Sequence, residues 1–304
     1  MRPLLPVIVL AALAAAGSGV HSSHAAFAAK GRNPANTFAT AASFPPAVTL
    51  AAPAPGSYTN DTTPTFSGAA GAATGDSNTV TLRIYAGATA TGTVVQTRNA
   101  TRSGATWTTT LPTALAQGTY TARATQSDSA GNTGSATVTF TVDTTRPTPT
   151  MVSAANAANG TKGRLDAGDS ITYTFSEAIA PSSVLAGFGG TTANVQVYLY
   201  NLGTTDYLAV LDESGQQQLG VADYVATNAE LVTANVTWPA TMTQSSDGRS
   251  FTITLGAAPA GGVAATVNTA KNMVWTAQAG PTDRAGNALS ISGTIAETDN
   301  DADF

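Results

Sequence analysis

Residues 118–142 read GTYTARATQSDSAGNTGSATVTFTV, and this stretch decides the fold class. On both sides of DSAGN, apolar side chains alternate with polar ones; the apolar members are Tyr120, Ala122, Ala124, Val138, Phe140 and Val142. Successive side chains of a strand point to opposite faces, so the alternation predicts two half-buried strands. Gly131 can adopt positive φ, and Asp128 and Asn132 can bond nearby backbone groups, so DSAGN predicts the hairpin turn between the strands.

The same pattern, Asp-x-Ala-Gly-Asn, occurs again as DRAGN at residues 283–287. A catalytic motif is needed once per active site, whereas a structural motif recurs wherever its fold recurs. The repeat therefore predicts that DSAGN and DRAGN each form the final hairpin of a repeated β module.

Similar alternation runs outward in both directions, as in VTLRI (80–84), SITYTFS (170–176), SFTITL (250–255) and LSISGTI (289–295), each of which is predicted to be a strand, and no stretch has a convincing helical period. About seven short strands over about 100 residues favour an immunoglobulin-like sandwich. Prolines 147 and 149 in VDTTRPTPT indicate a stiff connector. The sequence thus predicts an all-β chain with two tandem immunoglobulin-like β-sandwiches, after a signal peptide and a short linker.

The predicted boundaries are as follows: a signal peptide over 1–25, a flexible linker over 26–45, the first sandwich over 46–146, the second over 147–296, and an acidic tail over 297–304. Within the second sandwich, residues 201–230 are predicted to be an inserted hairpin or long loop. Pro181 is expected to begin a single helical turn.

The N-terminus carries the pattern of an export signal. Arg2 precedes an apolar run over residues 4–16, and the small-residue pattern Ser23-His24-Ala25 predicts cleavage after Ala25. The run is shorter than the ~20 residues that a membrane helix needs. We therefore expect a secreted protein, extracellular or associated with the cell surface, without a membrane span in the mature chain.

Composition excludes several function classes. The chain has no cysteine, 10% charged residues and a net charge of −5, which argues against nucleic-acid binding. Both histidines, His21 and His24, lie in the predicted signal peptide. The mature chain would therefore lack Ser-His-Asp and Cys-His catalysis and the usual zinc ligands. The kinds of chemistry that remain possible are paired carboxylates, Ser-Lys catalysis and hard cations bound by oxygen ligands.

Glycoside hydrolysis would need a pair of carboxylates, and the candidates are Asp166, Asp169 and Glu177. Asp169 and Glu177 are eight residues apart on one predicted strand, a distance of ~26 Å, too far to act as a pair. No Ser-x-x-Lys pattern involves the lysines of the mature chain, which are Lys30, Lys162 and Lys271. The sequence predicts that the protein is not an enzyme.

Three tryptophans, Trp107, Trp238 and Trp275, could form a sugar-binding platform or pack in the interior. Packing is favoured for Trp107 and Trp275, and both alternatives stay open for Trp238. Tyr120, just after Gly118, is predicted to be a corner tyrosine that ties a loop to its strand.

The segments PTFSG, GTYTARATQSDSAGN and TFTVDTTRPT together resemble the bacterial Ig-like domains of secreted and surface proteins, over residues 46–146. GDSITYTFSEAI and WTAQAGPTDRAGNAL resemble a second, divergent copy over residues 150–296. The resemblance implies a non-enzymatic structural or adhesion protein of the bacterial surface or extracellular matrix, with a surface protein, matrix protein or glycan as partner. The alternatives are a carbohydrate-binding protein and, third, a carboxylate-dependent hydrolase.

A second resemblance lies near the N-terminus. AAFAAKGRNPANTFATA resembles the region after the cleavage site in exported proteins processed by SipW-like signal peptidases. The residues that carry it are Asn33, Pro34, Asn36 and Phe38. A flexible Ala/Thr-rich linker is the alternative.

The last prediction from the sequence is a metal site. In an immunoglobulin-like sandwich, Asp61 of NDTTP and Asp143 of VDTTRP should lie at one pole, where the second module would present Asp283. Three carboxylates with backbone carbonyls suit Ca²⁺, which takes about 6–8 oxygen ligands. The resemblance adds that tandem Ig-like modules sometimes stiffen their linkers with calcium. The alternative is three solvated turn aspartates. No other cofactor is predicted.

Overall fold

The computed structural model describes residues 44–215, 224–227, 229–261 and 271–298. These residues belong to one compact unit, Ser43–Phe304. The predicted signal peptide, nearly all of the predicted linker, the SipW-like pattern, part of the segment 201–230 and most of the acidic tail lie outside the described residues.

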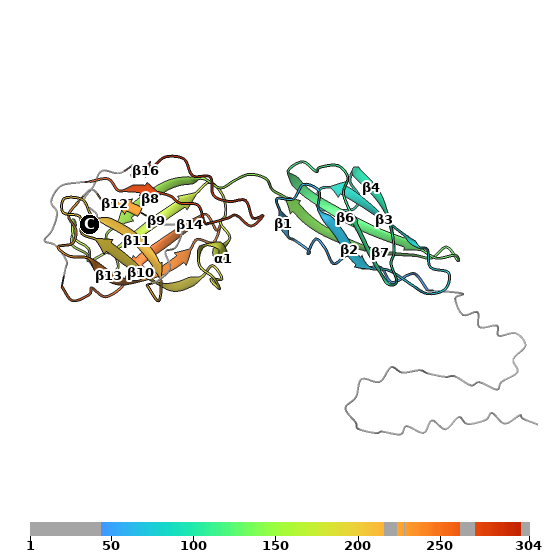
Figure 1. Cartoon of the computed structure of the whole chain (residues 1–304), viewed down its shortest axis with the longest axis horizontal. Helices are drawn as coiled ribbons and strands as arrows, with labels where there is room; N and C mark the ends of the chain where they lie inside the picture. The colour runs from blue at the N-terminus through green and yellow to red at the C-terminus, as the bar shows by residue number, and fades with distance from the viewer. Residues whose placement is uncertain (1–43, 216–223, 228, 262–270, 299–304) are drawn as a thin grey trace, which may run out of the picture. The chain divides into compact units, whose positions relative to one another are not determined.

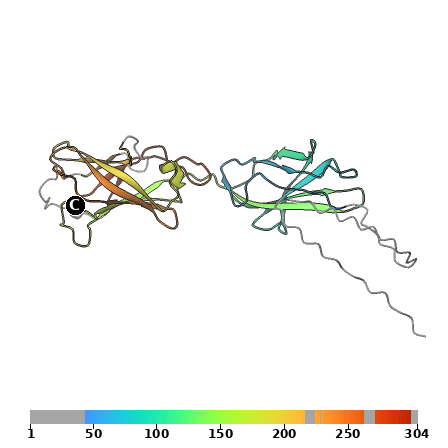
Figure 2. The ribbon, with the colours of Figure 1, turned by 90° about the horizontal axis from the view of Figure 1, so that it is seen from below.

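Seven strands form what we call the N-terminal sandwich: β1 (Tyr58–Thr59), β2 (Thr65–Ala69), β3 (Thr79–Ala86), β4 (Val94–Thr101), β5 (Thr106–Thr110), β6 (Gly118–Ser127) and β7 (Thr133–Val142). One sheet has the order β1-β7-β6-β3-β4 (Figure 1). The second sheet pairs β2 with β5. Figure 2 shows these strands, coloured blue to green, from below. The number of strands agrees with the prediction.

The alternating residues of β3, β6 and β7 build the core of this sandwich, as the sequence predicts. Val80, Leu82, Ile84 and Phe140 are fully buried. The hydroxyl of Tyr120 donates to the carbonyl of Ala116 at 2.9 Å, which confirms the predicted corner tyrosine.

The remaining strands form what we call the C-terminal sheet: β8 (Pro149–Ala155), β9 (Ser170–Phe175), β10 (Thr192–Tyr200), β11 (Tyr207–Asp212), β12 (Tyr224–Ala226), β13 (Val236–Gln244), β14 (Ser250–Leu255), β15 (Val274–Thr276) and β16 (Ile295–Ala296). Their order is β16-β15-β12-β11-β10-β13-β14-β9-β8. The helical turn α1 (Pro181–Val184) begins with proline, as expected. The all-β class predicted from the alternation is confirmed.

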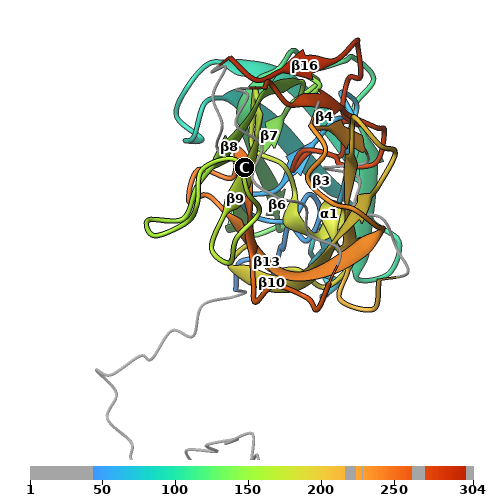
Figure 3. The same cartoon turned by 90° about the vertical axis from the view of Figure 1, so that its left-hand side faces the viewer.

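The C-terminal sheet is rolled so that its two outermost strands, β16 and β8, lie close together. Glu297, directly after β16, connects to β8 because its Oε1 accepts from the Ala154 N–H at 2.6 Å; its Oε2 accepts from the N–H of Met273, just before β15, at 3.2 Å. In Figure 3, β10 and β13 lie on the side of the roll opposite β16. The interior holds a hydrophobic cluster separate from that of the N-terminal sandwich.

The segment 201–230, expected to be an insertion, supplies β11 and β12 to the C-terminal sheet. The buried carboxylate of Asp206 holds the turn between β10 and β11 in place, because its Oδ2 accepts from the N–H groups of Leu231 and Val232 at 2.6 and 2.7 Å. This part of the segment is therefore integral to the sheet.

One predicted strand is mostly absent. LSISGTI (289–295) was expected to be extended and paired, yet only Ile295–Ala296 forms a strand there. The backbone groups at the start of this segment have other partners: Arg146 donates to the carbonyl of Leu289 at 3.0 Å, and the Ser290 N–H donates to the carbonyl of Pro147 at 2.8 Å. These bonds use groups that a sheet ladder would need.

Among the described residues, no helix has the length and apolar character of a membrane span.

Candidate functional site

The two Asp-x-Ala-Gly-Asn loops have the same internal hydrogen bonds. In the first, Oδ1 of Asp128 accepts from the N–H groups of Ala130 (3.0 Å) and Asn132 (2.8 Å), and Oδ2 accepts from the Asn132 side-chain amide (2.8 Å). In the second, Asp283 makes the corresponding bonds to residues 285 and 287, at 2.8, 2.8 and 2.7 Å. The glycine has a φ of +89° in both loops. The motif therefore specifies one loop conformation.

The second loop also contacts the end of the N-terminal sandwich. The side-chain amide of Asn287 donates to the Asp143 carbonyl at 2.8 Å. The N–H of Asn60 donates to the Ala285 carbonyl at 3.2 Å. The loop at residues 283–287 thus lies beside the segments that enter β2 and leave β7.

Three carboxylates meet at this place. Asp143 follows β7, Glu177 follows β9, and Asp283 begins the second loop; one carboxylate oxygen of each lies within 4.8 Å of the others. Burial raises the pKa of Glu177, the charges of Asp143 and Asp283 raise it further, and Arg249 lowers it. The Oε1 atom of Glu177 is buried and has no hydrogen-bond partner among the described residues.

Two of the three predicted calcium ligands, Asp143 and Asp283, belong to this group, and Asp61 does not. Oδ1 of Asp61 instead accepts from the N–H of Thr63 at 2.8 Å. Glu177 was not predicted as a ligand. The signal in the sequence that could have identified it is its position directly after the strand SITYTFS, because that end of the strand lies next to this loop. Such a group of carboxylate oxygens could coordinate a hard divalent cation.

Two of the three acids weighed for catalysis, Asp166 and Asp169, have structural partners. Asp169 is fully buried; its Oδ1 accepts from the Ala157 N–H at 2.8 Å and its Oδ2 from the Asp166 N–H at 2.6 Å. Burial raises the pKa of Asp169, and these two backbone hydrogen bonds lower it. Oδ2 of Asp166 accepts from the Thr161 N–H at 2.7 Å. Both side chains brace the turn before β9, whereas Glu177 follows the opposite end of that strand.

All three tryptophans pack in the interior: Trp107 is 2% exposed, and Trp238 and Trp275 are 0% exposed. The indole N–H of Trp107 donates to the carbonyls of Thr49 and Ala69, and that of Trp238 donates to the carbonyl of Gly256. Interior packing is therefore confirmed for Trp107 and Trp275. Trp238, for which both alternatives were open, packs in the interior as well. None of them forms a sugar-binding platform.

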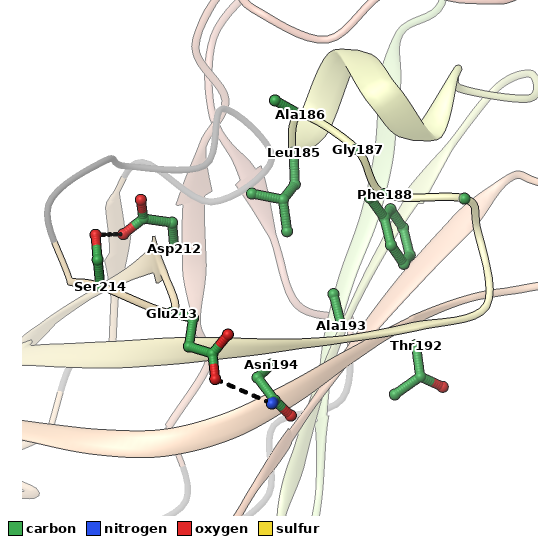
Figure 4. Close-up of a pocket in the computed structure, with 11 residues that line it drawn as sticks. Leu185, Ala186, Gly187, Phe188, Thr192, Ala193, Asn194, Asp212, Glu213 and Ser214 are labelled. Carbon is green, nitrogen blue, oxygen red and sulfur yellow. Dashed lines mark hydrogen bonds between the residues drawn. The ribbon is translucent and has the colours of Figure 1, made fainter.

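A cleft of about 630 Å³ lies where the chain after α1 passes the start of β10 and the end of β11. Leu185 and Phe188 form its apolar side, and Asn194 and Glu213 lie on its polar side (Figure 4). The Asn194 amide donates to Oε1 of Glu213 at 3.1 Å. The volume falls in the range of small-molecule sites, about 300–1,000 Å³.

No curated protein matches this chain. Among solved structures, the chain is similar to a tetra-tandem repeat in the extending region of a large adhesion protein, with 19% identity, a TM-score of 0.25, and coverage of 82% of this chain and 48% of the other. It is also similar to dimeric latent PorU from Porphyromonas gingivalis, with 18% identity, a TM-score of 0.24, and coverage of 83% and 20%.

A third similar structure is trypsin-activated alpha-2-macroglobulin from Escherichia coli, with 13% identity, a TM-score of 0.26, and coverage of 79% of this chain and 17% of the other. The chain therefore spans about half or less of each of these structures. The TM-scores are too low to establish a common fold over the whole chain. The family comparison is more specific: residues 53–144, which contain all seven strands of the N-terminal sandwich, match the family described as bacterial Ig-like domain.

Proposed function

We propose that this protein is a secreted, non-enzymatic Ig-like protein that serves as a structural and adhesion element of the bacterial surface or extracellular matrix. The observation that carries the proposal is the match of residues 53–144 to the bacterial Ig-like domain. The direct hydrogen bonds between residues 143–147 and the 283–290 segment support a structural role, because they attach one β unit to the next without a long free linker.

Export can be tested by expressing the full chain with a C-terminal epitope tag in a bacterial host. We expect the tagged protein in the medium or at the cell surface, with Ala26 as its first residue after cleavage. Fractionation and N-terminal sequencing measure both. A full-length chain retained in the cytoplasm would contradict the proposal, and an Ile8→Arg variant, which interrupts the apolar run, is the matched control.

The non-enzymatic character rests on the structural partners of Asp166 and Asp169 and on the lack of histidine and cysteine after residue 25. A panel of chromogenic glycosides tests it. Hydrolysis that is lost in Glu177→Gln or Asp169→Asn would establish the carboxylate-dependent alternative.

The calcium site stays a prediction, with Glu177 in place of Asp61 in its ligand set. Calorimetric titration of the purified chain with CaCl₂ tests it, and Glu177→Gln should weaken binding because one charged oxygen ligand is lost. Asp61→Ala is the matched control: it should bind like the wild type if the ligands are Asp143, Glu177 and Asp283. The absence of binding heat in the wild type would favour solvated acids.

A further inference from the structure

The outer face of β10 carries a row of polar and aromatic side chains. Val195, Val197 and Leu199 point into the core, so Asn194, Gln196, Tyr198 and Tyr200 point outward at period two. From residue 194 to residue 200 the strand extends about 20 Å at about 3.3 Å per residue. This row spans the length of a short oligosaccharide.

Strand β11 widens the aromatic end of the row. Tyr200 lies directly opposite Tyr207, and Tyr198 lies opposite Ala209. Directly opposite residues share a face, so the three tyrosines gather on the outer surface. Ala209, opposite Tyr198, is 0% exposed although its position in the register is outward.

Two of the rings form a corner. The centroids of Tyr198 and Tyr200 are 4.5 Å apart, with an angle of 69° between the ring planes. The two rings therefore pack edge to face. Within the described part of the chain, the hydroxyls of Tyr198 and Tyr207 form no hydrogen bond with protein, so they are available to a ligand.

The other end of the row leads into the cleft described above (Figure 4). Asn194 and Glu213 border this cleft, and the Gln196 amide donates to the Glu213 carbonyl at 3.4 Å. A carboxylate and two amides offer planar donors and acceptors of the kind that bind vicinal hydroxyl groups.

We propose that the outer face of β10 and β11 binds a neutral polysaccharide chain, with Tyr198 and Tyr207 stacking on sugar rings and Asn194, Gln196 and Glu213 binding hydroxyl groups. The electron-rich face of an aromatic ring suits the C–H groups on the face of a pyranose. Glu213 carries a negative charge at this surface, so the binding of nucleic acids and acidic glycans is disfavoured. The proposal deepens the extracellular role above by naming the ligand class.

The ligand class can be tested by native gel electrophoresis of the purified mature chain in gels that contain xylan, mannan, laminarin or hydroxyethylcellulose. We expect slower migration in at least one gel. Tyr198→Ala should weaken that binding by about tenfold, the effect of losing about 1.4 kcal/mol of stacking, and Tyr198→Phe should retain most of it. Glu213→Gln should weaken binding to a smaller extent.

Tyr58→Ala is the matched control, because Tyr58 is a 43% exposed tyrosine of the N-terminal sandwich. It should bind like the wild type, and equal melting temperatures establish that the variants are folded. Unchanged migration in all four gels would overturn the proposal, as would binding that Tyr198→Ala and Tyr207→Ala leave intact. A fifth gel contains dextran sulfate, an acidic polysaccharide, and slower migration in that gel alone would also overturn the proposal. Because the assay uses purified protein, its failure is distinguishable from a failure of export.

Discussion

The loops DSAGN and DRAGN have the same internal structure in different surroundings. Their corresponding side-chain hydrogen bonds differ by at most 0.2 Å, and the glycine φ is the same. The first loop joins two ten-residue strands, β6 and β7. The second lies between the short strands β15 and β16, with only the isolated bridges Ile179–Asp283 and Thr282–Ala288 near it among the described residues.

The loop conformation therefore does not depend on a long hairpin ladder. In the second copy, the aspartate side chain orders the backbone that the absent ladder would otherwise hold, and the loop is free to meet the segments at Asn60 and Asp143. One local motif thus closes a hairpin in the N-terminal sandwich and forms a joint beside the C-terminal sheet. Its sequence determines its shape, and its neighbours determine its role.

The largest expected effect comes from removing the aspartate. Asp128→Ala and Asp283→Ala each leave two backbone N–H groups and one amide without their acceptor, so each should lower the free energy of unfolding by about 3 kcal/mol. In Asp283→Ala, relief of the repulsion of Glu177 should offset part of the loss. Urea unfolding measures both. Equal stability of wild type and variants would show that the carboxylates do not hold the loops.

The next effect tests whether the two glycines are equivalent. Gly131→Val and Gly286→Val should each cost about 2 kcal/mol, because a β-branched residue is strained at φ +89°. An added Cβ meets nothing within 4 Å at Gly131, and the Asn60 amide at 3.7 Å at Gly286. The cost is thus almost entirely backbone strain in both. Calorimetric melting should show the loss, and Gly→Ala at the same positions should cost less than Gly→Val.

The sequence predicted the alternating strands, the loop conformation and the corner tyrosine, because each depends on residues close together in the chain. Glu177 was missed as a neighbour of Asp143 and Asp283 because that contact depends on where three distant segments end. The aromatic row was missed for a related reason. Tyr198 and Tyr200 alternate on β10 as core residues would, and only the burial of Val195, Val197 and Leu199 in the folded sheet shows that the tyrosines point outward.

A smaller effect separates the loops by their charge. Because the pKa of Glu177 is raised, the folded state binds a proton more tightly than the unfolded state. The free energy of unfolding should therefore fall as pH rises from the ordinary value of 4.5 through the raised pKa. Glu177→Gln removes this dependence. In calcium-free buffer it should be more stable than the wild type at neutral pH and equally stable below pH 4.5, and a variant less stable at neutral pH would contradict the like-charge account.

The smallest effect concerns the bonds that attach the second loop to the connector. Arg146 donates from Nε to the Ala288 carbonyl at 2.8 Å and from Nη2 to the Leu289 carbonyl at 3.0 Å. Lysine keeps the charge but lacks the two-pronged guanidinium, so Arg146→Lys should lose one of the two hydrogen bonds and lower the free energy of unfolding by about 0.5–1 kcal/mol.

The Ser290 N–H, bonded to the Pro147 carbonyl, reports on this attachment. Its hydrogen exchange should become severalfold faster, while the Asn132 N–H of the first loop exchanges as before. Equal acceleration at both amides would mean that the substitution loosens the whole chain, and no acceleration at Ser290 would mean that the loop is held by Asn287 and Asn60 without the arginine.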